Sequence, residues 1–242
     1  YYKACDVSKY KEVKETITHI ENKISKINIA LLNATAYSPN RNQEFDINSS
    51  SKWEERYSNG DIGWDIGEPT PIFVNISKNL NPGKVCILGC GNGYDAIMLS
   101  QNGFEVTAVD FAPSPIKYIN KKAKELSLNI NTIQKNIFSL TPKYNSQFDY
   151  IIEQTCYCAI DPKKRNEYGK LVFELLKPGG ILIGLWFPLD KKIEEGGPPH
   201  AVSEEEIKTL FNKGRVLIEE RFPKNSIEPR LKREKLIIFE KL

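Results

Sequence analysis

Short apolar runs alternate with longer amphipathic stretches along the chain from residue 84 onward. Short apolar runs bounded by turn residues are typical of buried strands, and apolar residues spaced three or four apart are typical of helices. Regular alternation of the two predicts a doubly wound α/β sheet. The first five expected strands are Lys84–Gly89, Glu105–Asp110, Asn129–Gln134, Phe148–Gln154 and Gly180–Phe187.

The amphipathic stretches predict helices, which are expected near Tyr94–Gln101, Ser114–Leu126, Lys163–Leu176 and Ser203–Asn212. The breaker residues Lys177-Pro178-Gly179-Gly180 end the third of them with a tight turn. Two more apolar runs follow, Arg215–Phe222 and Lys235–Glu240. The polar segment between these two is too short for a crossover helix, so we expect an antiparallel pair. Five parallel strands and this pair make a seven-stranded, mostly parallel sheet.

A glycine-rich turn follows the first strand and reads Gly89-Cys90-Gly91-Asn92-Gly93. Glycine lets the backbone turn sharply and lets a ligand approach without meeting a Cβ. Asp110 ends the second strand, 17 residues after Gly93. A carboxylate at that place can accept hydrogen bonds from ribose hydroxyls. The turn and the acid together predict a site for an adenosine-containing ligand.

The form of the turn separates two kinds of adenosine ligand. A dinucleotide turn reads G-x-G-x-x-G, but Tyr94 follows Gly93 here and the next position is not glycine either. The G-x-G-x-G form is commoner in methyltransferases, where no pyrophosphate is bound. Further candidate cofactor residues follow the second and third strands or lie at the end of the fourth, and these are Phe111, Asn136, Ile137 and Glu153. Asn136 stands where an acid often contacts adenine in that superfamily, so it departs from the usual pattern.

Composition and charge narrow the classes of function. The 242 residues are 40% hydrophobic and 27% charged, with a net charge of +3, which fits a globular protein of one to two domains. So mild a charge does not indicate a nucleic-acid surface. No run approaches the ~20 apolar residues of a membrane span, and no signal peptide is visible. The missing initial Met leads us to expect a processed, truncated or fused product.

Cysteine and histidine exclude several chemistries. An odd count of five cysteines argues for a reducing compartment, so a cytoplasmic location is expected. Cys156 and Cys158 form C-x-C, which lacks the spacing of a zinc site. His19 and His200 are the two histidines, so a His-rich metal site is excluded and a Ser-His-Asp hydrolase is not indicated. We therefore expect no metal, and a reaction that needs few general bases.

Five motifs, in order, carry a more specific signal. They are Trp53-Glu54-Glu55-Arg56-Tyr57, the run from Gly63 to Pro71, Cys158-Ala159-Ile160-Asp161-Pro162, Leu176-Lys177-Pro178-Gly179-Gly180 and Gly196-Gly197-Pro198-Pro199-His200. From about Lys52 to Leu242 the chain resembles the thiopurine S-methyltransferase family, especially its halide and thiol (thiocyanate) branch. The resemblance implies a Rossmann-like class I fold and S-adenosylmethionine (SAM) as cofactor.

The resemblance also implies roles for aromatic residues. An N-terminal aromatic segment closes over the cofactor in that family, and Trp53, Tyr57 and Trp64 match it, with Tyr57 replacing what is often Trp. Aromatic faces hold a sulfonium cation well once water is excluded. The methyl group would pass in line to a soft nucleophile such as iodide, bromide, thiocyanate or a thiol. No catalytic residue is certain; Trp64, Tyr157 and Glu153 would position the reactants, and the acceptor pocket would use Trp64, Tyr157, Trp186, Phe187 and a loop containing Gly197, Pro198 and His200.

The first fifty residues read differently from the rest. Asp6, Val7, Asn33 and Ala34 resemble elements of a short-chain dehydrogenase, but the glycine-rich first turn of such enzymes is missing. We expect a strand–helix–strand appendage over 1–50, with Asn40–Lys52 as linker, and a methyltransferase domain over 51–242. Two alternatives stay open: a protein related to NAD(P)-dependent oxidoreductases, and a SAM-binding domain without activity. The acceptor and the oligomeric state stay open as well.

Overall fold

The computed structural model describes residues 46–242. The part of the expected appendage up to residue 45, with its dehydrogenase-like residues, lies outside the described residues. Within 46–242 a seven-stranded sheet has the order β3-β2-β1-β4-β5-β7-β6. The strands are β1 (Lys84–Leu88), β2 (Glu105–Asp110), β3 (Ile130–Gln134), β4 (Phe148–Gln154), β5 (Leu176–Trp186), β6 (Arg215–Arg221) and β7 (Lys235–Lys241).

The first five strands are parallel, and β7 pairs antiparallel with both β5 and β6. The sequence prediction of five parallel strands and an antiparallel pair is therefore confirmed. Three of the four parallel connections carry an α-helix, and the connection from β3 to β4 carries a 3₁₀ turn, η1 (Ile137–Ser139). The segment from β6 to β7 also holds one short 3₁₀ turn, η4 (Glu228–Arg230), and returns the chain antiparallel.

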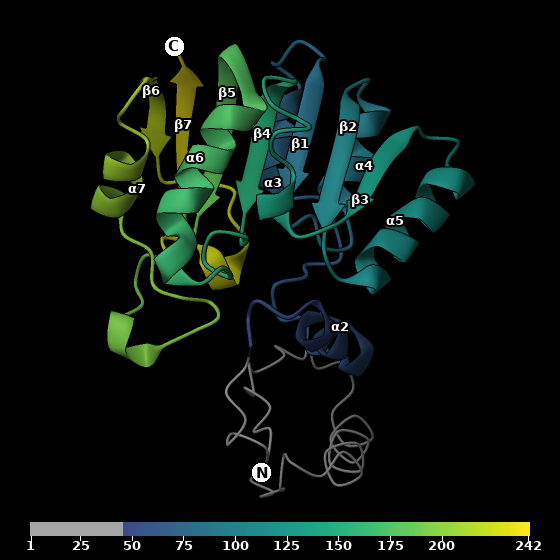
Figure 1. Cartoon of the computed structure of the whole chain (residues 1–242), viewed down its shortest axis with the longest axis horizontal. Coiled ribbons are helices and arrows are strands. Elements are labelled where there is room, and N and C mark those ends of the chain that lie inside the picture. Colours follow the sequence, from purple (N-terminus) through teal and green to yellow (C-terminus); the bar gives the residue numbers. More distant parts are fainter. Residues whose placement is uncertain (1–45) are drawn as a thin grey trace, which may run out of the picture. The chain divides into compact units, whose positions relative to one another are not determined.

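Helices cover both faces of the sheet (Figure 1). One face packs against α3 (Pro71–Ser77), α4 (Tyr94–Gln101) and α5 (Pro113–Glu125), and the other against α6 (Arg165–Leu175) and α7 (Glu204–Leu210). Successive strand residues enter opposite cores: Val85 and Ile87 lie in the first, Cys86 and Leu88 in the second. This alternation explains why the strands read as continuous apolar runs.

Three regions differ in kind from the sequence prediction, and the other differences shift a boundary by one or two residues. Helix α2 (Ser50–Asn59) begins inside the expected linker, so Ser50–Lys52 are helical, and neither α2 nor α3 was predicted. Strand β5 begins at Leu176, because the backbone of Lys177–Gly180 runs on as an irregular strand beside β4 instead of leaving the sheet. The expected helix from Lys163 is a 3₁₀ turn, η2 (Pro162–Lys164), followed by α6.

Helix α2 lies beyond the carboxyl ends of the parallel strands, the ends to which the arrows of β2 and β4 point in Figure 1. Crevices at that edge are where open α/β sheets bind ligands. Glu54 of α2 accepts hydrogen bonds from the backbone N–H and hydroxyl of Ser114, in the first turn of α5. Among residues 46–242, no helix is long and apolar enough to span a bilayer.

Candidate active site

The glycine-rich turn after β1 is shaped by close packing. Gly89, Gly91 and Gly93 all have positive φ, at 62°, 53° and 70°. A Cβ on Gly93 would lie 2.4 Å from Cγ1 of Ile119, and one on Gly89 would lie 2.9 Å from Sγ of Cys156. Glycine is therefore required twice over, by backbone conformation and by space.

Asp110 closes β2 directly beside this turn. Its carboxylate accepts the backbone N–H of Gly91 at 3.0 Å and that of Ala112 at 2.9 Å. Burial raises its pKa to about 6, although these N–H groups pull the other way. Each carboxylate oxygen accepts one of these bonds and keeps capacity for a second. Asp110 can thus orient the turn and still accept a hydroxyl from a ligand.

Three aromatic rings form a cluster over the same turn. The Trp64 ring meets the rings of Trp53 and Tyr57 edge to face, each with centroids 5.6 Å apart. A Cβ on Gly91 would lie 3.4 Å from the Tyr57 hydroxyl and 4.0 Å from Nε1 of Trp64. Burial raises the pKa of Tyr57, and the charge of Asp110 raises it further. Tyr57 therefore lies close to both Trp64 and Asp110. We call Trp53, Tyr57 and Trp64 the aromatic lid.

Polar contacts hold the loop that follows α2. The side-chain amide of Asn92 donates to Asp65 at 2.5 Å, which ties this loop to the glycine turn. Thr70 donates its N–H and hydroxyl to Asp95, at 2.8 and 2.9 Å. These partners were missed from the sequence. Asp65 and Thr70 do stand in a motif that carried the resemblance, but their role depends on residues 25 or more positions away.

The three candidates after β2 and β3 occupy different environments. Asn136 caps the 3₁₀ turn η1 (Ile137–Ser139), since its side-chain oxygen accepts the N–H of Phe138 at 3.1 Å. Ile137 is buried in the core between the sheet and α6. Phe111 is half-buried directly after Asp110. Of these, Asn136 and Phe111 retain polar or aromatic atoms near the carboxyl edge.

Glu153, at the end of β4, is 1% exposed and accepts three hydrogen bonds. Its carboxylate accepts the N–H of Cys156 at 3.1 Å, the N–H of Tyr157 at 2.9 Å and the hydroxyl of Tyr168. Burial raises its pKa to about 7 against the effect of these donors. Glu153 therefore fixes the loop after β4, which carries Tyr157.

The aromatic residues predicted for the acceptor side separate into two groups. Tyr157 and Trp186 are each 1% exposed and meet edge to face at 5.3 Å, and Trp186 also contacts Phe211 of the core. Phe187 is half-buried beyond the end of β5, and the guanidiniums of Arg230 and Arg233 lie 5.5 and 5.2 Å from its ring centroid. Phe187 thus lies among cations, whereas Trp186 supports Tyr157 from the core.

The loop with Gly197, Pro198 and His200 is attached to the same side. The N–H of His200 donates to the carbonyl of Cys158 at 2.7 Å, and a Cβ on Gly197 would lie 2.5 Å from the His200 ring. Burial lowers the pKa of His200, and the charges of Arg165 and Lys191 lower it further. His200 is therefore neutral at pH 7.

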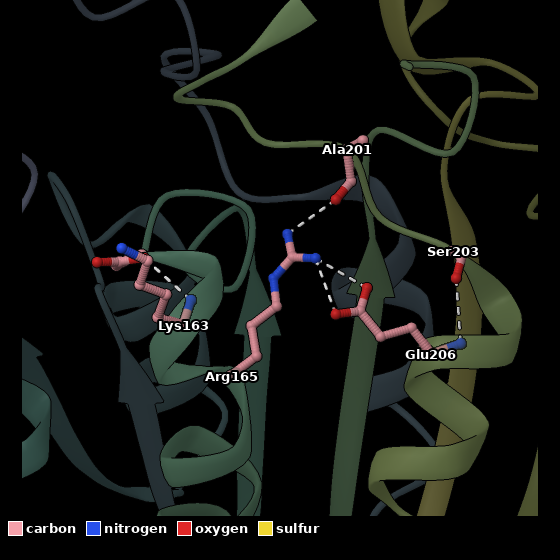
Figure 2. A network of polar contacts seen from close by, with 6 residues as sticks. Lys163, Arg165, Ala201, Ser203 and Glu206 are labelled. Carbon is pink, nitrogen blue, oxygen red and sulfur yellow. Dashed lines mark hydrogen bonds and ion pairs between the residues drawn. The ribbon is translucent and has the colours of Figure 1, made fainter. Parts of the chain in front are cut away.

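Arg165 anchors the far end of this loop (Figure 2). Its guanidinium donates to both carboxylate oxygens of Glu206, at 2.9 and 2.8 Å, and to the carbonyl of Ala201 at 2.8 Å. The same guanidinium lies 4.5 Å from the centroid of the Tyr157 ring. Ser203 caps α7 by accepting the N–H of Glu206 at 3.1 Å. The network joins α6, α7 and the loop around Tyr157.

The cradle at the glycine turn fits SAM. Gly91 leaves its backbone open beside the lid, Asp110 offers acceptor capacity for a ribose, and the lid rings offer aromatic surface for a sulfonium. A seven-stranded sheet of this order, with this turn after β1 and an acid at the end of β2, defines a Rossmann-like class I SAM-dependent methyltransferase.

The chain belongs to the thiopurine S-methyltransferase (TPMT) family, whose model matches residues 48–240. The probable thiol methyltransferase 2 of Arabidopsis thaliana is 32% identical over 168 residues, 68% of this chain and 73% of that protein. Thiocyanate methyltransferase 1 of Brassica oleracea is 31% identical over 159 residues, 62% of this chain and 67% of that protein.

Among solved structures, the fold is similar to that of the Burkholderia thailandensis 1,6-didemethyltoxoflavin-N1-methyltransferase, solved with S-adenosylhomocysteine bound. The TM-score is 0.63 at 19% identity, over 79% of this chain and 86% of that one. The family predicted from the five motifs is thus confirmed, and SAM is the cofactor of this protein.

Proposed function

We propose that this protein transfers the methyl group of SAM to a soft nucleophile, a thiol or thiocyanate, and that halides are further acceptors. Support comes from the two plant relatives, which are named for thiol and thiocyanate methylation. The observation that carries the proposal is the state of the bases at the site. Glu153 is buried and already accepts three hydrogen bonds, and burial together with the charges of Arg165 and Lys191 lowers the pKa of His200.

Few free bases favour acceptors that arrive already ionised. Thiocyanate and halides carry their charge at every physiological pH, and a thiol of pKa ~8.5 is partly ionised at pH 7. A hydroxyl or amine acceptor would instead require a group that removes its proton in the transition state. Catalysis can then depend on holding donor and acceptor in line at about 3–3.5 Å and free of water.

Each part of the site has a role in this proposal. SAM supplies, when bound, a methyl group activated by its sulfonium. Asp110 accepts ribose hydroxyls, Asn136 and Phe111 border the adenine, and the aromatic lid excludes water from the sulfonium. Glu153 positions Tyr157 through the loop after β4. The acceptor lies between Trp64, Tyr157, Phe187 and the loop with Gly197, Pro198 and His200.

One panel assay tests the proposal. The protein is incubated with SAM and, in separate reactions, with iodide, bromide, thiocyanate, sulfide, a small thiol and a thiopurine. Headspace detection of a methyl halide, methyl thiocyanate or a methyl thioether, absent when SAM is omitted, supports it. Tight binding of S-adenosylhomocysteine without product from any of these acceptors contradicts it, and favours a SAM-binding domain without activity.

Two further expectations belong to the proposal. The free thiols of Cys86, Cys90, Cys156 and Cys158 agree with a reducing compartment, and we propose the cytoplasm. We also propose that residues 51–242 make up the methyltransferase domain, with residues 1–50 as an appendage. Expression of residues 46–242 alone, followed by calorimetry with S-adenosylhomocysteine, tests that division.

A further inference from the structure

A buried arginine from the C-terminal part of the chain reaches the active-site edge. Arg230, the last residue of η4, is 5% exposed. Its guanidinium donates to the carbonyl oxygen of Trp64 at 2.6 Å, a contact across 166 positions of sequence. The guanidinium also lies 5.5 Å from the centroid of the Phe187 ring. It therefore stands between the lid loop and the end of β5, on the acceptor side.

The charge of Arg230 has no close counterion among the described residues. Arg165 forms an ion pair with Glu206 at 2.8 Å and Arg233 one with Asp190 at 2.7 Å, but no carboxylate oxygen within 46–242 lies within 4.0 Å of the Arg230 guanidinium. The charges of Glu234 and Asp95 act on it from farther away. A buried cation without a counterion is costly, and Arg lowers that cost best by binding an anion.

The two carboxyls whose charges act on Arg230, those of Glu234 and Asp95, are themselves in buried surroundings. Glu234 is 1% exposed, one of its carboxylate oxygens has no hydrogen-bond partner, and burial raises its pKa. Asp95 is held by two hydrogen bonds from Thr70, and burial raises its pKa to about 6. Burial thus raises the pKa of both carboxyls, and neither forms an ion pair with Arg230.

We propose that Arg230 is the acceptor-binding cation, which selects anionic acceptors by pairing with their charge beside Phe187 and under the Trp64 loop. This inference rests on the proposed function and narrows it, because it assigns the substrate class as anions: thiocyanate, halides and thiolates. Guanidinium is weakly hydrated, and so suits large polarisable anions that lose their own water readily. A protonated thiol gains nothing from this cation.

The test uses thiocyanate and two variants of the full chain. Arg230→Gln removes the charge but can still donate to the carbonyl of Trp64, and Arg230→Lys keeps the charge. The matched control is Arg233→Met, because Arg233 also lies over Phe187, at 5.2 Å, but is paired with Asp190. Calorimetry measures thiocyanate binding to the complex with S-adenosylhomocysteine, and kinetics give KM and kcat for thiocyanate.

We expect Arg230→Gln to weaken thiocyanate binding about tenfold or more and to raise KM with a smaller change in kcat, since a charge-assisted hydrogen bond is lost. Arg230→Lys recovers part of the loss, Arg233→Met stays within about twofold, and affinity for S-adenosylhomocysteine is unchanged in all three variants.

Several results would overturn the inference. Equal thiocyanate affinity in Arg230→Gln and the unaltered protein would do so, as would no binding of thiocyanate to the unaltered protein. A parallel loss of S-adenosylhomocysteine affinity in Arg230→Gln would show that Arg230 fastens the lid or holds the cofactor instead. Thiocyanate that binds through Arg230 but is not methylated would leave the inference standing and remove the proposed function.

Discussion

The carboxyl edge of the sheet has two sides that are built in different ways. The cofactor side takes its turn, its acid and Phe111 from one stretch of the chain, residues 84–111, and the aromatic lid comes from α2 and the loop after it, earlier in the chain. The acceptor side gathers Tyr157, Phe187, His200 and Arg230 from four separate segments. Cofactor binding is thus encoded locally, whereas acceptor choice depends on how distant segments pack. Acceptor specificity can therefore change while the cofactor side stays intact.

Two buried carboxyls, one on each side of this edge, also differ in what they can do. Asp110 accepts two backbone N–H bonds and keeps spare acceptor capacity beside the lid. Glu153 accepts three donors, one of them the Tyr168 hydroxyl, and lies in the core. One carboxyl can bind a ligand, and the other holds a loop. Three substitutions, taken from the largest expected effect to the smallest, test this division.

The largest effect is expected at the backbone of the cofactor side. Gly93→Ala places a Cβ 2.4 Å from Cγ1 of Ile119 at a φ of +70°. Overpacking and a left-handed alanine together should destabilise the protein by about 3 kcal/mol and abolish binding of S-adenosylhomocysteine. Urea denaturation and calorimetry measure both quantities.

Gly103→Ala is the matched control for Gly93→Ala. Gly103 has a φ of +86°, but its added Cβ would meet nothing closer than Pro82 at 3.9 Å. It should cost about 1 kcal/mol, for the left-handed conformation alone, and leave cofactor affinity unchanged. Equal losses in the two variants would mean that backbone conformation, and not space around the glycine turn, requires Gly93.

The sequence predicted those parts of the fold that depend on neighbouring residues. Strands β2 and β4 and helix α4 have the predicted bounds, because apolar runs and periodicity are local signals. Helices α2 and α3 were missed. Helix α2 is amphipathic but has no buried residue, and α3 is 7 residues long, so neither carries a strong apolar pattern.

The sequence likewise predicted those site residues that stand in contiguous motifs, and it missed Arg230. Gly93, Asp110 and the lid residues come from contiguous motifs, and the structure brings them together. Arg230 gives no signal in the sequence, since an arginine in a polar segment reads as a surface residue. Its burial arises when the turn before β7 packs under the Trp64 loop, a contact that no short-range pattern contains.

A smaller effect is expected at the carboxyl of the cofactor side. Asp110→Asn should weaken S-adenosylhomocysteine binding about tenfold at pH 8, because ribose hydroxyls lose a charged acceptor. The pKa of Asp110 is raised to about 6, so in the unaltered protein the carboxylate is lost as pH falls through 6 and cofactor affinity should fall with it. Calorimetry from pH 5 to 8 follows the change.

In the Asp110→Asn variant, residue 110 does not titrate, so it should cause no change in S-adenosylhomocysteine affinity between pH 5 and 8. Asp95 is present in both proteins, and its pKa is also about 6, so the comparison isolates Asp110. The same pH dependence in both proteins would remove Asp110 from the cofactor site.

The smallest effect is expected at the carboxyl of the acceptor side. Glu153→Gln keeps an oxygen for the N–H groups of Cys156 and Tyr157 and offers an amide to Tyr168, so affinity for S-adenosylhomocysteine should stay within about twofold. Stability should change in its dependence on pH. The pKa of Glu153 is raised by burial from 4.5 to about 7, so its contribution is fully present below pH 4.5 and is lost as pH rises through 7. Melting temperatures from pH 5 to 8 should therefore fall less steeply in Glu153→Gln than in the unaltered protein. If cofactor affinity fell instead, Glu153 would contact the ligand as Asp110 does, and the two sides of the edge would not be divided between binding and support.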